Sequence, residues 1–324
     1  MILEIVMPHY NEPWSIVRPY FDMLRCQRGV DFSQFTVHIV HDGTQEFPQS
    51  YFYDMPFNVR QSVIKHSGVS AARNYGLDHA DAKWITFCDC DDTFSNVYAL
   101  KIVFDVLDTE DYDLLWNAFI IENNVGGKLF LHPNEKFNMI WTHNKYYRLD
   151  FLKRIGLHFN ENLHFSEDSA FNAVVNCEID QDRIGTIKSP FPMYVWSWRA
   201  GSATINPQNR MRNIEGHFDR NCYVLEEFRK RDLPDTIPMV GRTLTDAYFQ
   251  TTRKDIVEDT GPLMKRIAEF YKKEKQNFEK ISKEDFVKVY HASEKEVTDS
   301  GLINPNRPIF DDWLEELMER GEET

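Results

Sequence analysis

Short apolar runs alternate with helical patterns along the first part of the chain. Runs rich in β-forming residues, each stopping at polar or turn-forming residues, predict strands at 2–7, 35–40, 59–64 and 84–88. Apolar residues at helical spacing predict helices just after Pro13, over 68–80 and over 96–107, and a further apolar run covers 114–121. The order β-α-β-β-α-β-α-β predicts an α/β fold, in which a layered sheet of largely parallel strands is flanked by helices.

The pattern changes beyond residue 121. Residues 123–128 read Asn-Asn-Val-Gly-Gly-Lys and predict the tip of a hairpin. From about residue 206 helical patterns dominate, over 214–229, 243–252, 263–278 and 310–318. Residues 254–288 mix both charge signs, which is typical of solvated helix faces. We therefore expect an α/β domain over 1–205 and a helical region over 206–324.

Composition narrows the class of protein. The chain has 324 residues, of which 42% are hydrophobic and 27% charged, so it can bury a sizeable core. A net charge of -14 argues against a general affinity for nucleic acid, which requires neutralising Lys and Arg. Five cysteines without a CxxC pair indicate reduced thiols and a cytoplasmic protein. We expect neither a signal peptide, since a basic n-region is missing, nor a transmembrane segment.

Three carboxylates, Asp89, Asp91 and Asp92, follow the predicted strand 84–88 at once. Such crowded like charges cost stability unless a cation lies among them, and hard cations such as Mg²⁺ and Mn²⁺ prefer oxygen ligands. Ligands of open α/β sheets bind beyond the carboxyl ends of strands. The stretch therefore predicts a metal site, although a polar turn that caps the next helix remains an alternative.

Four segments carry sequence motifs: Val-Met-Pro-His-Tyr-Asn-Glu at 6–12, Ile-Val-His-Asp-Gly-Thr at 39–44, Gly-Val-Ser-Ala-Ala-Arg-Asn-Tyr-Gly-Leu at 68–77 and Phe-Cys-Asp-Cys-Asp-Asp at 87–92. Together and in this order they resemble the family 2 glycosyltransferases of GT-A fold. Weaker similarity extends over 141–171 and to Arg-Ala-Gly-Ser at 199–202. His41 departs from the family, which has an aspartate there, and near Arg199 we identify no histidine to complete a metal shell. The resemblance ends near residue 205.

The resemblance implies a metal-dependent, inverting transfer of a hexosyl group from a nucleotide sugar to an acceptor hydroxyl. Asp91 would be the central ligand of Mn²⁺ or Mg²⁺, with Asp89 and Asp92 beside it. A carboxylate can accept a hydrogen bond from uracil N3–H, which favours a UDP-sugar. The residues expected to bind the donor are Pro8, Tyr10, Asn11, Glu12 and Asp42 around the base, and Arg73, Asn74, Arg199 and Ser202 toward the phosphates. Arg73 would face the phosphates or brace the aspartates.

Asp168 is the candidate general base, because it lies in the Glu-Asp pair of the family pattern at an expected helix start. We expect only one member of that pair to face the acceptor, since consecutive residues at a helix start point in different directions. A pair of charges stabilised by the helix dipole is the alternative role. The 206–324 region would bind the acceptor or form a homo-oligomer.

Two other classes of function stay open. One is a catalytically inactive module that binds a nucleotide sugar or glycan. The other is a nucleotidyltransferase, which is disfavoured because residues 8–13 contain no glycine for a phosphate loop. The acceptor cannot be read from the sequence: a glycan, a protein, a lipid or, in a phage setting, a modified DNA base all remain candidates.

Overall fold

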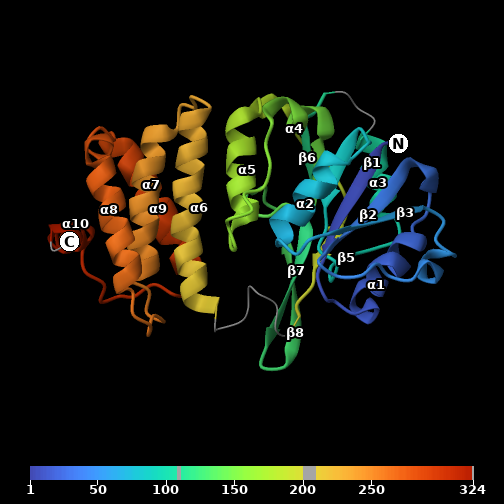
Figure 1. Ribbon diagram of the computed structural model, residues 1–324, viewed down its shortest axis with the longest axis horizontal. Helices are drawn as coiled ribbons and strands as arrows, with labels where there is room; N and C mark the ends of the chain where they lie inside the picture. Colours follow the sequence, from blue (N-terminus) through green and yellow to red (C-terminus); the bar gives the residue numbers. More distant parts are fainter. Residues whose placement is uncertain (108–110, 200–208, 323–324) are drawn as a thin grey trace. The chain divides into compact units, whose positions relative to one another are not determined.

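The computed structural model describes residues 1–107, 111–199 and 209–322. The chain divides into two compact units, Met1–Ser202 and Ala203–Thr324. The first is built from strands and helices, and the second from helices (Figure 1).

A seven-stranded sheet forms the centre of the first unit, with strand order β10-β6-β9-β4-β1-β2-β3. Neighbouring strands are parallel except where β9 pairs with β4 and β6. This largely parallel sheet confirms the predicted α/β class. The strands are β1 (Leu3–His9), β2 (Phe35–Asp42), β3 (Asn58–Ile64), β4 (Trp84–Phe87), β6 (Leu114–Trp116), β9 (Lys145–Arg148) and β10 (Ile184–Thr186).

A smaller four-stranded sheet has the order β5-β11-β7-β8. Its strands are β5 (Thr93–Phe94), β7 (Phe119–Val125), β8 (Lys128–Asn134) and β11 (Tyr194–Trp196). Strands β7 and β8 form the predicted hairpin, with Gly126 and Gly127 at positive φ in its tip. The apolar run over 114–121 was expected to form one strand, and this was wrong. The chain passes from the large sheet to the small one after Trp116, so the run contributes to both β6 and β7.

Helices cover both faces of the large sheet (Figure 1). Their bounds are α1 (Trp14–Arg25), α2 (Val69–Asp78), α3 (Ala99–Leu107), α4 (Leu149–Ile155) and α5 (Glu167–Glu178), with short 3-10 turns at Phe32–Gln34, Gln49–Phe52 and Gln181–Arg183. The apolar residues of α1 and α3 pack on the face that carries Ile5 and Leu115. Helix α2 covers the opposite face so closely that a Cβ on Gly76 would overlap with Cγ1 of Val6. Glycine is therefore required at this crossing.

The second unit consists of α6 (Arg210–Lys230), α7 (Thr236–Thr251), α8 (Gly261–Phe278), α9 (Lys283–Asp299) and α10 (Phe310–Glu322). The four helices expected from the sequence are present. Helix α9 was missed, and α7 begins earlier than expected because Pro238 lies in its first turn, where proline is tolerated. Gly241 lets α7 approach its neighbours, since a Cβ there would lie 2.8 Å from Cδ1 of Ile281.

A network of charged side chains lies inside the second unit. Atoms of His217, Asp246 and Glu296 that could bind a metal lie within 4.8 Å of one another. However, Arg242 donates to Glu296 at 2.6 Å and Arg220 lies 3.5 Å from Asp246. Burial would raise the pKa of Asp246, but Arg242, His217 and Arg220 outweigh it and lower that pKa. Because arginines already supply the compensating charge, we interpret the cluster as an internal ion network.

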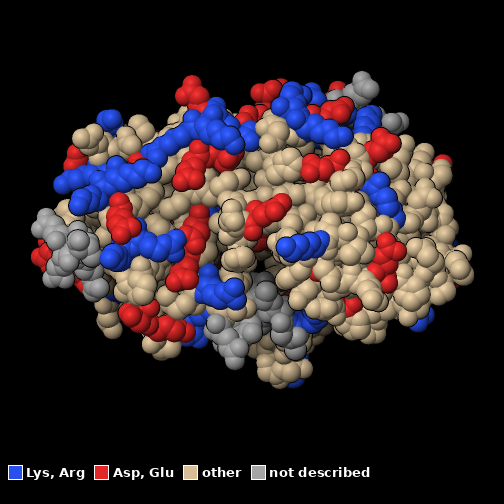
Figure 2. Space-filling model, in the orientation of Figure 1, with Lys and Arg blue, Asp and Glu red and all other residues tan. Residues whose placement is uncertain are grey.

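The surface of the second unit carries both charge signs, as expected. Ion pairs along α9 include Lys288 with Glu284 and Lys295 with Asp299. Figure 2 shows Lys and Arg interspersed with Asp and Glu over the face that it draws. Among the described residues, no helix is both long and apolar enough to cross a membrane.

Candidate active site

Three parallel strands bring the predicted donor residues to one edge of the large sheet. Strand β1 lies between β4 and β2, and all three run in the same direction, so their carboxyl ends share an edge. The turn after β1, the end of β2 at Asp42 and the acidic stretch after β4 therefore meet there.

Asp42 holds the loop that leads into α2. Its Oδ1 accepts a hydrogen bond from Ser67 N at 2.7 Å, and its Oδ2 accepts from Gly68 N at 2.9 Å and lies 2.8 Å from His66 Nδ1. A carboxylate offers about four lone-pair positions. These contacts use three of them and Asp42 is only 3% exposed, so at most one position is left for a ligand.

An aromatic pair lies beside Asp42. The Tyr10 and His66 rings are stacked, with centroids 4.4 Å apart and planes inclined by 17°. Tyr10 is 47% exposed, so this flat surface is open to solvent. His66 was not predicted, and no sequence signal marks it, because a residue after the third strand reaches Tyr10 only in the folded sheet.

The other residues of the first turn have different surroundings. Pro8 is a buried strand residue that lies in register with Val40, so its ring is not available to a ligand. Asn11 adopts φ +61°, and the Glu12 carboxylate accepts a hydrogen bond from Tyr10 N at 3.0 Å. The open part of the turn is thus Tyr10 to Glu12.

His41, at the position where the family has an aspartate, is fully buried. Its Nδ1 lies 2.9 Å from His9 Nδ1, and its Nε2 lies 2.9 Å from Gln61 Oε1. Burial lowers the pKa of His41 to about 4, so the ring is neutral near pH 7. The substitution therefore changes the interior of the sheet and leaves the open edge unchanged.

Asp91 and Glu12 share one guanidinium. Arg199 Nε donates to Asp91 Oδ2 at 2.8 Å, and Arg199 Nη2 lies 3.3 Å from Glu12 Oε1. Burial opposes the charge of Arg199, but Asp91 and Glu12 outweigh it and raise the pKa of Arg199. The predicted phosphate-binding arginine thus lies beside the predicted central metal ligand. Ser202, its expected companion, lies outside the described residues.

Asp92 requires a revision of the metal hypothesis. It is only 2% exposed, and its oxygens accept from the Tyr194 hydroxyl at 2.7 Å and from Ser197 N at 2.8 Å. Burial, followed by the charges of Asp89 and Asp91, raises its pKa well above the usual range. Asp92 therefore ties the end of β11 to the acidic stretch and does not face the open edge as a metal ligand would.

Arg73 joins three carboxylates. Its side chain is 4% exposed, and its Nη2 donates to Asp89 at 3.1 Å while its Nη1 donates to Glu167 at 2.9 Å and to Asp168 at 2.5 Å. Burial alone would lower the pKa of Arg73, but Asp168, Asp89 and Glu167 raise it. Of the two roles predicted for Arg73, the structure therefore favours bracing the carboxylates.

Asn74, predicted to bind the donor, has an internal role instead. Its amide Nδ2 donates to the Phe159 carbonyl at 2.9 Å and to Glu161 at 3.0 Å, and its Oδ1 accepts from Phe159 N at 2.8 Å. The residue is 7% exposed. Because both ends of the amide are used within the protein, Asn74 fixes α2 to segment 159–161.

Asp168 is held from two sides at the start of α5. Its Oδ1 accepts a hydrogen bond from Arg73. Its Oδ2 accepts from Thr142 N at 3.1 Å and from Thr142 Oγ1 at 2.9 Å. Glu167 contacts the same Arg73 nitrogen, so the expectation that the two neighbours point apart was wrong. Burial, then Asp168, raises the pKa of Glu167 to about 7 although Arg73 opposes the shift.

Lys145 is a second titratable group near Asp168 that the sequence did not single out. It is 4% exposed, and its Nζ donates to the Trp141 carbonyl at 2.5 Å. Burial lowers the pKa of Lys145 to about 7, against the charge of Asp168. The neighbouring His143 is also buried, which lowers its pKa to about 3, so it is neutral.

The carboxylates fit a hard divalent cation. The Asp89 side chain is 41% exposed and the Asp91 side chain 20%, so oxygens of both are accessible at the sheet edge. Carboxylate oxygens are the ligands that Mg²⁺ and Mn²⁺ prefer. Both residues also contact arginines, Asp89 with Arg73 and Asp91 with Arg199, so a bound cation would share these carboxylates with the two guanidinium groups.

Comparison with known proteins gives the family of the chain. The family described as "Glycosyl transferase family 2" matches residues 4–175, more than half of the chain. The minor teichoic acid biosynthesis protein GgaB of Bacillus subtilis is 26% identical over 289 residues, which cover 79% of this chain and 30% of GgaB. The uncharacterized glycosyltransferase EpsJ of Bacillus subtilis is 25% identical over 53% of this chain and 55% of EpsJ. This chain thus spans only part of the length of both relatives.

The fold is shared with solved structures. Residues 1–349 of S. aureus TarS, in complex with UDP, superpose with a TM-score of 0.64 at 17% identity, covering 96% of this chain and 99% of TarS 1-349. The mannosyltransferase PcManGT of Pyrobaculum calidifontis, in complex with GDP-Man and Mn²⁺, superposes with a TM-score of 0.51 at 12% identity, covering 92% and 87%. With its family match and this shared architecture, the chain belongs to glycosyl transferase family 2 and has the GT-A fold.

Proposed function

We propose that the chain moves a hexosyl group from a UDP-sugar to an acceptor hydroxyl, with a divalent metal and with inversion at the anomeric carbon. The observation that carries this proposal is the position of Arg73. It connects Asp89, at the proposed metal site, with Asp168, the proposed base. The groups needed for the leaving diphosphate and for the acceptor therefore lie on either side of one guanidinium.

Uridine is the proposed base of the donor. The exposed Tyr10–His66 pair offers a flat surface on which a pyrimidine can stack, and Asp42 lies in contact with His66. The remaining acceptor position of Asp42 suits uracil N3–H, whereas cytosine has no hydrogen on N3. The UDP complex of TarS supports this choice, while the GDP-Man complex of PcManGT is the reason to test other bases.

The diphosphate is proposed to lie between the acidic stretch and Arg199. Asp89 and Asp91 would hold the metal, which supplies Lewis-acid stabilisation of the charge that develops on the leaving group. Arg199 presents a planar donor fork, which suits phosphate oxygens. Glu12 would keep that fork in place, because it contacts a different guanidinium nitrogen from the one that Asp91 contacts.

Asp168 is proposed to accept the proton of the acceptor hydroxyl. As the proton leaves, the hydroxyl oxygen attacks the anomeric carbon on the side opposite the diphosphate, and this single displacement inverts the configuration. Arg73 and Thr142 orient the carboxylate of Asp168, since all three of their hydrogen bonds go to its oxygens. A general base has to be ionised to accept a proton.

A screen of the purified protein against UDP-, GDP- and CDP-sugars with Mn²⁺ tests the proposal, with released nucleotide as the readout. We expect release from a UDP-sugar that stops with excess EDTA and returns when Mn²⁺ or Mg²⁺ is added. Full activity in EDTA would refute the metal site. Binding of the sugar nucleotide without any turnover would identify an inactive binding module.

The helical second unit is proposed to govern acceptor choice or self-association. Its helices bury an apolar core of their own around Leu263, Ile267 and Trp313, and none of the proposed donor residues lies in it. A chain ending at residue 206 should keep UDP binding and donor hydrolysis if it remains soluble. Loss of UDP binding in a folded fragment would show that the division of roles is wrong.

A further inference from the structure

The first unit contains a pocket that none of the donor residues lines. Its volume is about 300 Å³, which lies at the lower end of the roughly 300–1,000 Å³ typical of small-molecule sites. The lining residues are Trp116, Ala118, Glu135, Thr186, Ile187, Lys188, Ser189, Pro190, Phe191 and Pro192. The size suits one sugar-sized ring rather than a nucleotide.

The wall of the pocket is a loop fixed at both ends. Ile187 N donates to the Trp116 carbonyl at 2.8 Å, and Met193 N donates to the Ala118 carbonyl at 2.9 Å. Between these two hydrogen bonds the chain passes from β10 of the large sheet to β11 of the small sheet, and Pro190 and Pro192 lie in this connection. Proline restricts φ, so the wall is preformed and a ligand has little to order.

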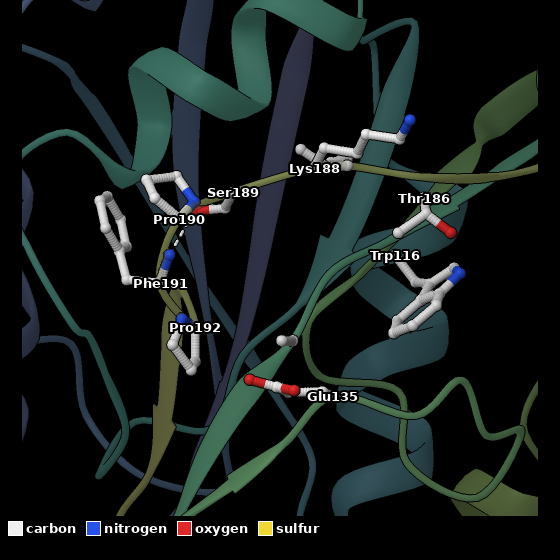
Figure 3. A pocket seen from close by; sticks show the side chains of 10 residues that line it. Trp116, Glu135, Thr186, Lys188, Ser189, Pro190, Phe191 and Pro192 are labelled. Atoms are coloured by element: carbon white, nitrogen blue, oxygen red, sulfur yellow. Dashed lines mark hydrogen bonds between the residues drawn. The ribbon is translucent and has the colours of Figure 1, made fainter.

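The lining combines two aromatic rings, those of Trp116 and Phe191, with polar groups. The Trp116 ring also contacts the Phe137 ring, with centroids 5.2 Å apart. Figure 3 shows Trp116 and Thr186 on one side, the segment from Ser189 to Pro192 on the other, and Glu135 at the bottom. In the described part of the chain, the indole nitrogen of Trp116, the carboxylate of Glu135 and the hydroxyl of Thr186 have no hydrogen-bond or ion-pair partner. These groups are available to a ligand.

We propose that this pocket binds a neutral sugar ring of the acceptor. One face of a pyranose is formed by C–H groups and suits the flat indole of Trp116, while its rim of hydroxyls suits the carboxylate and hydroxyl groups. Glu135 and the rim residue Lys188 balance in charge, which favours a ligand without net charge. Assigning the sugar to the acceptor rests on the proposed function.

Strand register connects the pocket with the proposed base. Trp116 is the cross-strand partner of Thr186 on one side and of Lys145 on the other, so the three side chains emerge on the same face of the sheet. Lys145 Nζ in turn donates to the Trp141 carbonyl, next to Thr142, which holds Asp168. The pocket is therefore one strand away from the segment that orients the base. A sugar bound in it would be a neighbour of the unit that receives the hexosyl group, which makes the acceptor an oligosaccharide or polysaccharide.

Direct binding of saccharides tests the inference without donor or metal. Saturation-transfer NMR with free disaccharides of glucose, galactose, N-acetylglucosamine and N-acetylgalactosamine should show contact of at least one with the full chain. Trp116→Ala should weaken that binding by roughly three- to tenfold, because the stacked contact is lost. Tyr53→Ala, at an aromatic residue that is 83% exposed and outside the pocket, is the matched control and should bind as the wild type does.

The Trp116 variant decides the result if it folds, as checked by circular dichroism. If it does not fold, Glu135→Gln decides, since Glu135 is exposed and its carboxylate should contribute at least about threefold. Absence of disaccharide binding, or wild-type affinity in the deciding variant, overturns the inference. Donor hydrolysis by the wild type is measured separately. Hydrolysis without Trp116-dependent binding refutes the pocket alone, and Trp116-dependent binding without hydrolysis refutes the proposed function alone.

Discussion

Asp168→Asn should affect both catalysis and stability, because the carboxylate has two structural partners as well as its proposed catalytic role. Its two oxygens accept from Arg73 on one side and from the backbone and hydroxyl of Thr142 on the other. An asparagine has a single carbonyl oxygen. Whichever way its amide is turned, an NH₂ group then faces donors, of Arg73 or of Thr142.

The magnitudes follow from these contacts. A hydrogen bond to a charged group contributes about 1.5–3 kcal/mol, and the Asp168 side chain is only 18% exposed, so solvent compensates little. We expect the free energy of unfolding to fall by about 2–3 kcal/mol. Loss of general base catalysis should reduce turnover by roughly a hundred- to ten-thousand-fold. UDP affinity should change little, because the proposed base and uridine sites are separate.

Thr142→Val is the matched control for the stability effect. It keeps the shape of the side chain and the backbone donor but removes the hydroxyl that holds Asp168, while the basic carboxylate remains. Stability should fall by about 1.5–3 kcal/mol, with turnover reduced by less than about tenfold. Chemical denaturation and single-turnover transfer are the two assays. If Asp168→Asn retains most of its transfer rate, or if Thr142→Val loses as much rate as Asp168→Asn, then Asp168 is not the base.

The remaining predictions concern the donor, the packing of the sheet and a buried amine. Calorimetry should show that UDP binds more tightly than CDP or GDP, and that Asp42→Ala abolishes this preference; equal affinities in the wild type would contradict the uracil contact. Gly76→Ala should lower the free energy of unfolding by about 1–3 kcal/mol, because its methyl group would overlap with Val6, and an unchanged melting curve would contradict that packing. Lys145→Met should be more stable than the wild type at pH 6 but not at pH 10, because the pKa of Lys145 is about 7 when folded and about 10.5 when unfolded. Between these values the unfolded chain binds the extra proton, so the stability of the wild type relative to the variant rises by about 1.4 kcal/mol per pH unit; a stability difference independent of pH would contradict the shifted pKa.

Site residues that directly follow a strand could be located from the sequence. Asp42, Asp89 and Asp91 come directly after apolar runs, and parallel pairing alone brings such residues to one edge. Arg73 could be placed on helix α2 from the sequence. Whether it contacts phosphates or carboxylates could not be predicted, because its carboxylate partners Glu167 and Asp168 lie on α5, far along the chain.

Side-chain burial set the limit of that reasoning. Asp92 and Asn74 look like ligand-binding residues in sequence, yet both are buried. Asp92 contacts Tyr194, about 100 positions away, and Asn74 contacts Phe159, about 85 positions away. His66 and Thr142 were missed for the same reason, since neither has a local pattern and both act through a residue from another element. Long-range polar contacts of this kind cannot be read from periodicity.

The order of strands in the large sheet bears on how the protein folds during synthesis. Strand β6 pairs with β9 on one side and with β10 on the other, and β10 ends at Thr186. Until those residues have left the ribosome, β6 presents an unpaired edge of backbone donors and acceptors, which is a site of aggregation. The helices of the second unit mainly contact helices one or two positions away along the chain, which are nearer in sequence than β6 and β10, and should therefore form faster. The unit that is made first should therefore be the slower one to reach its native state, and conditions that limit chaperones should affect it before they affect the helical unit.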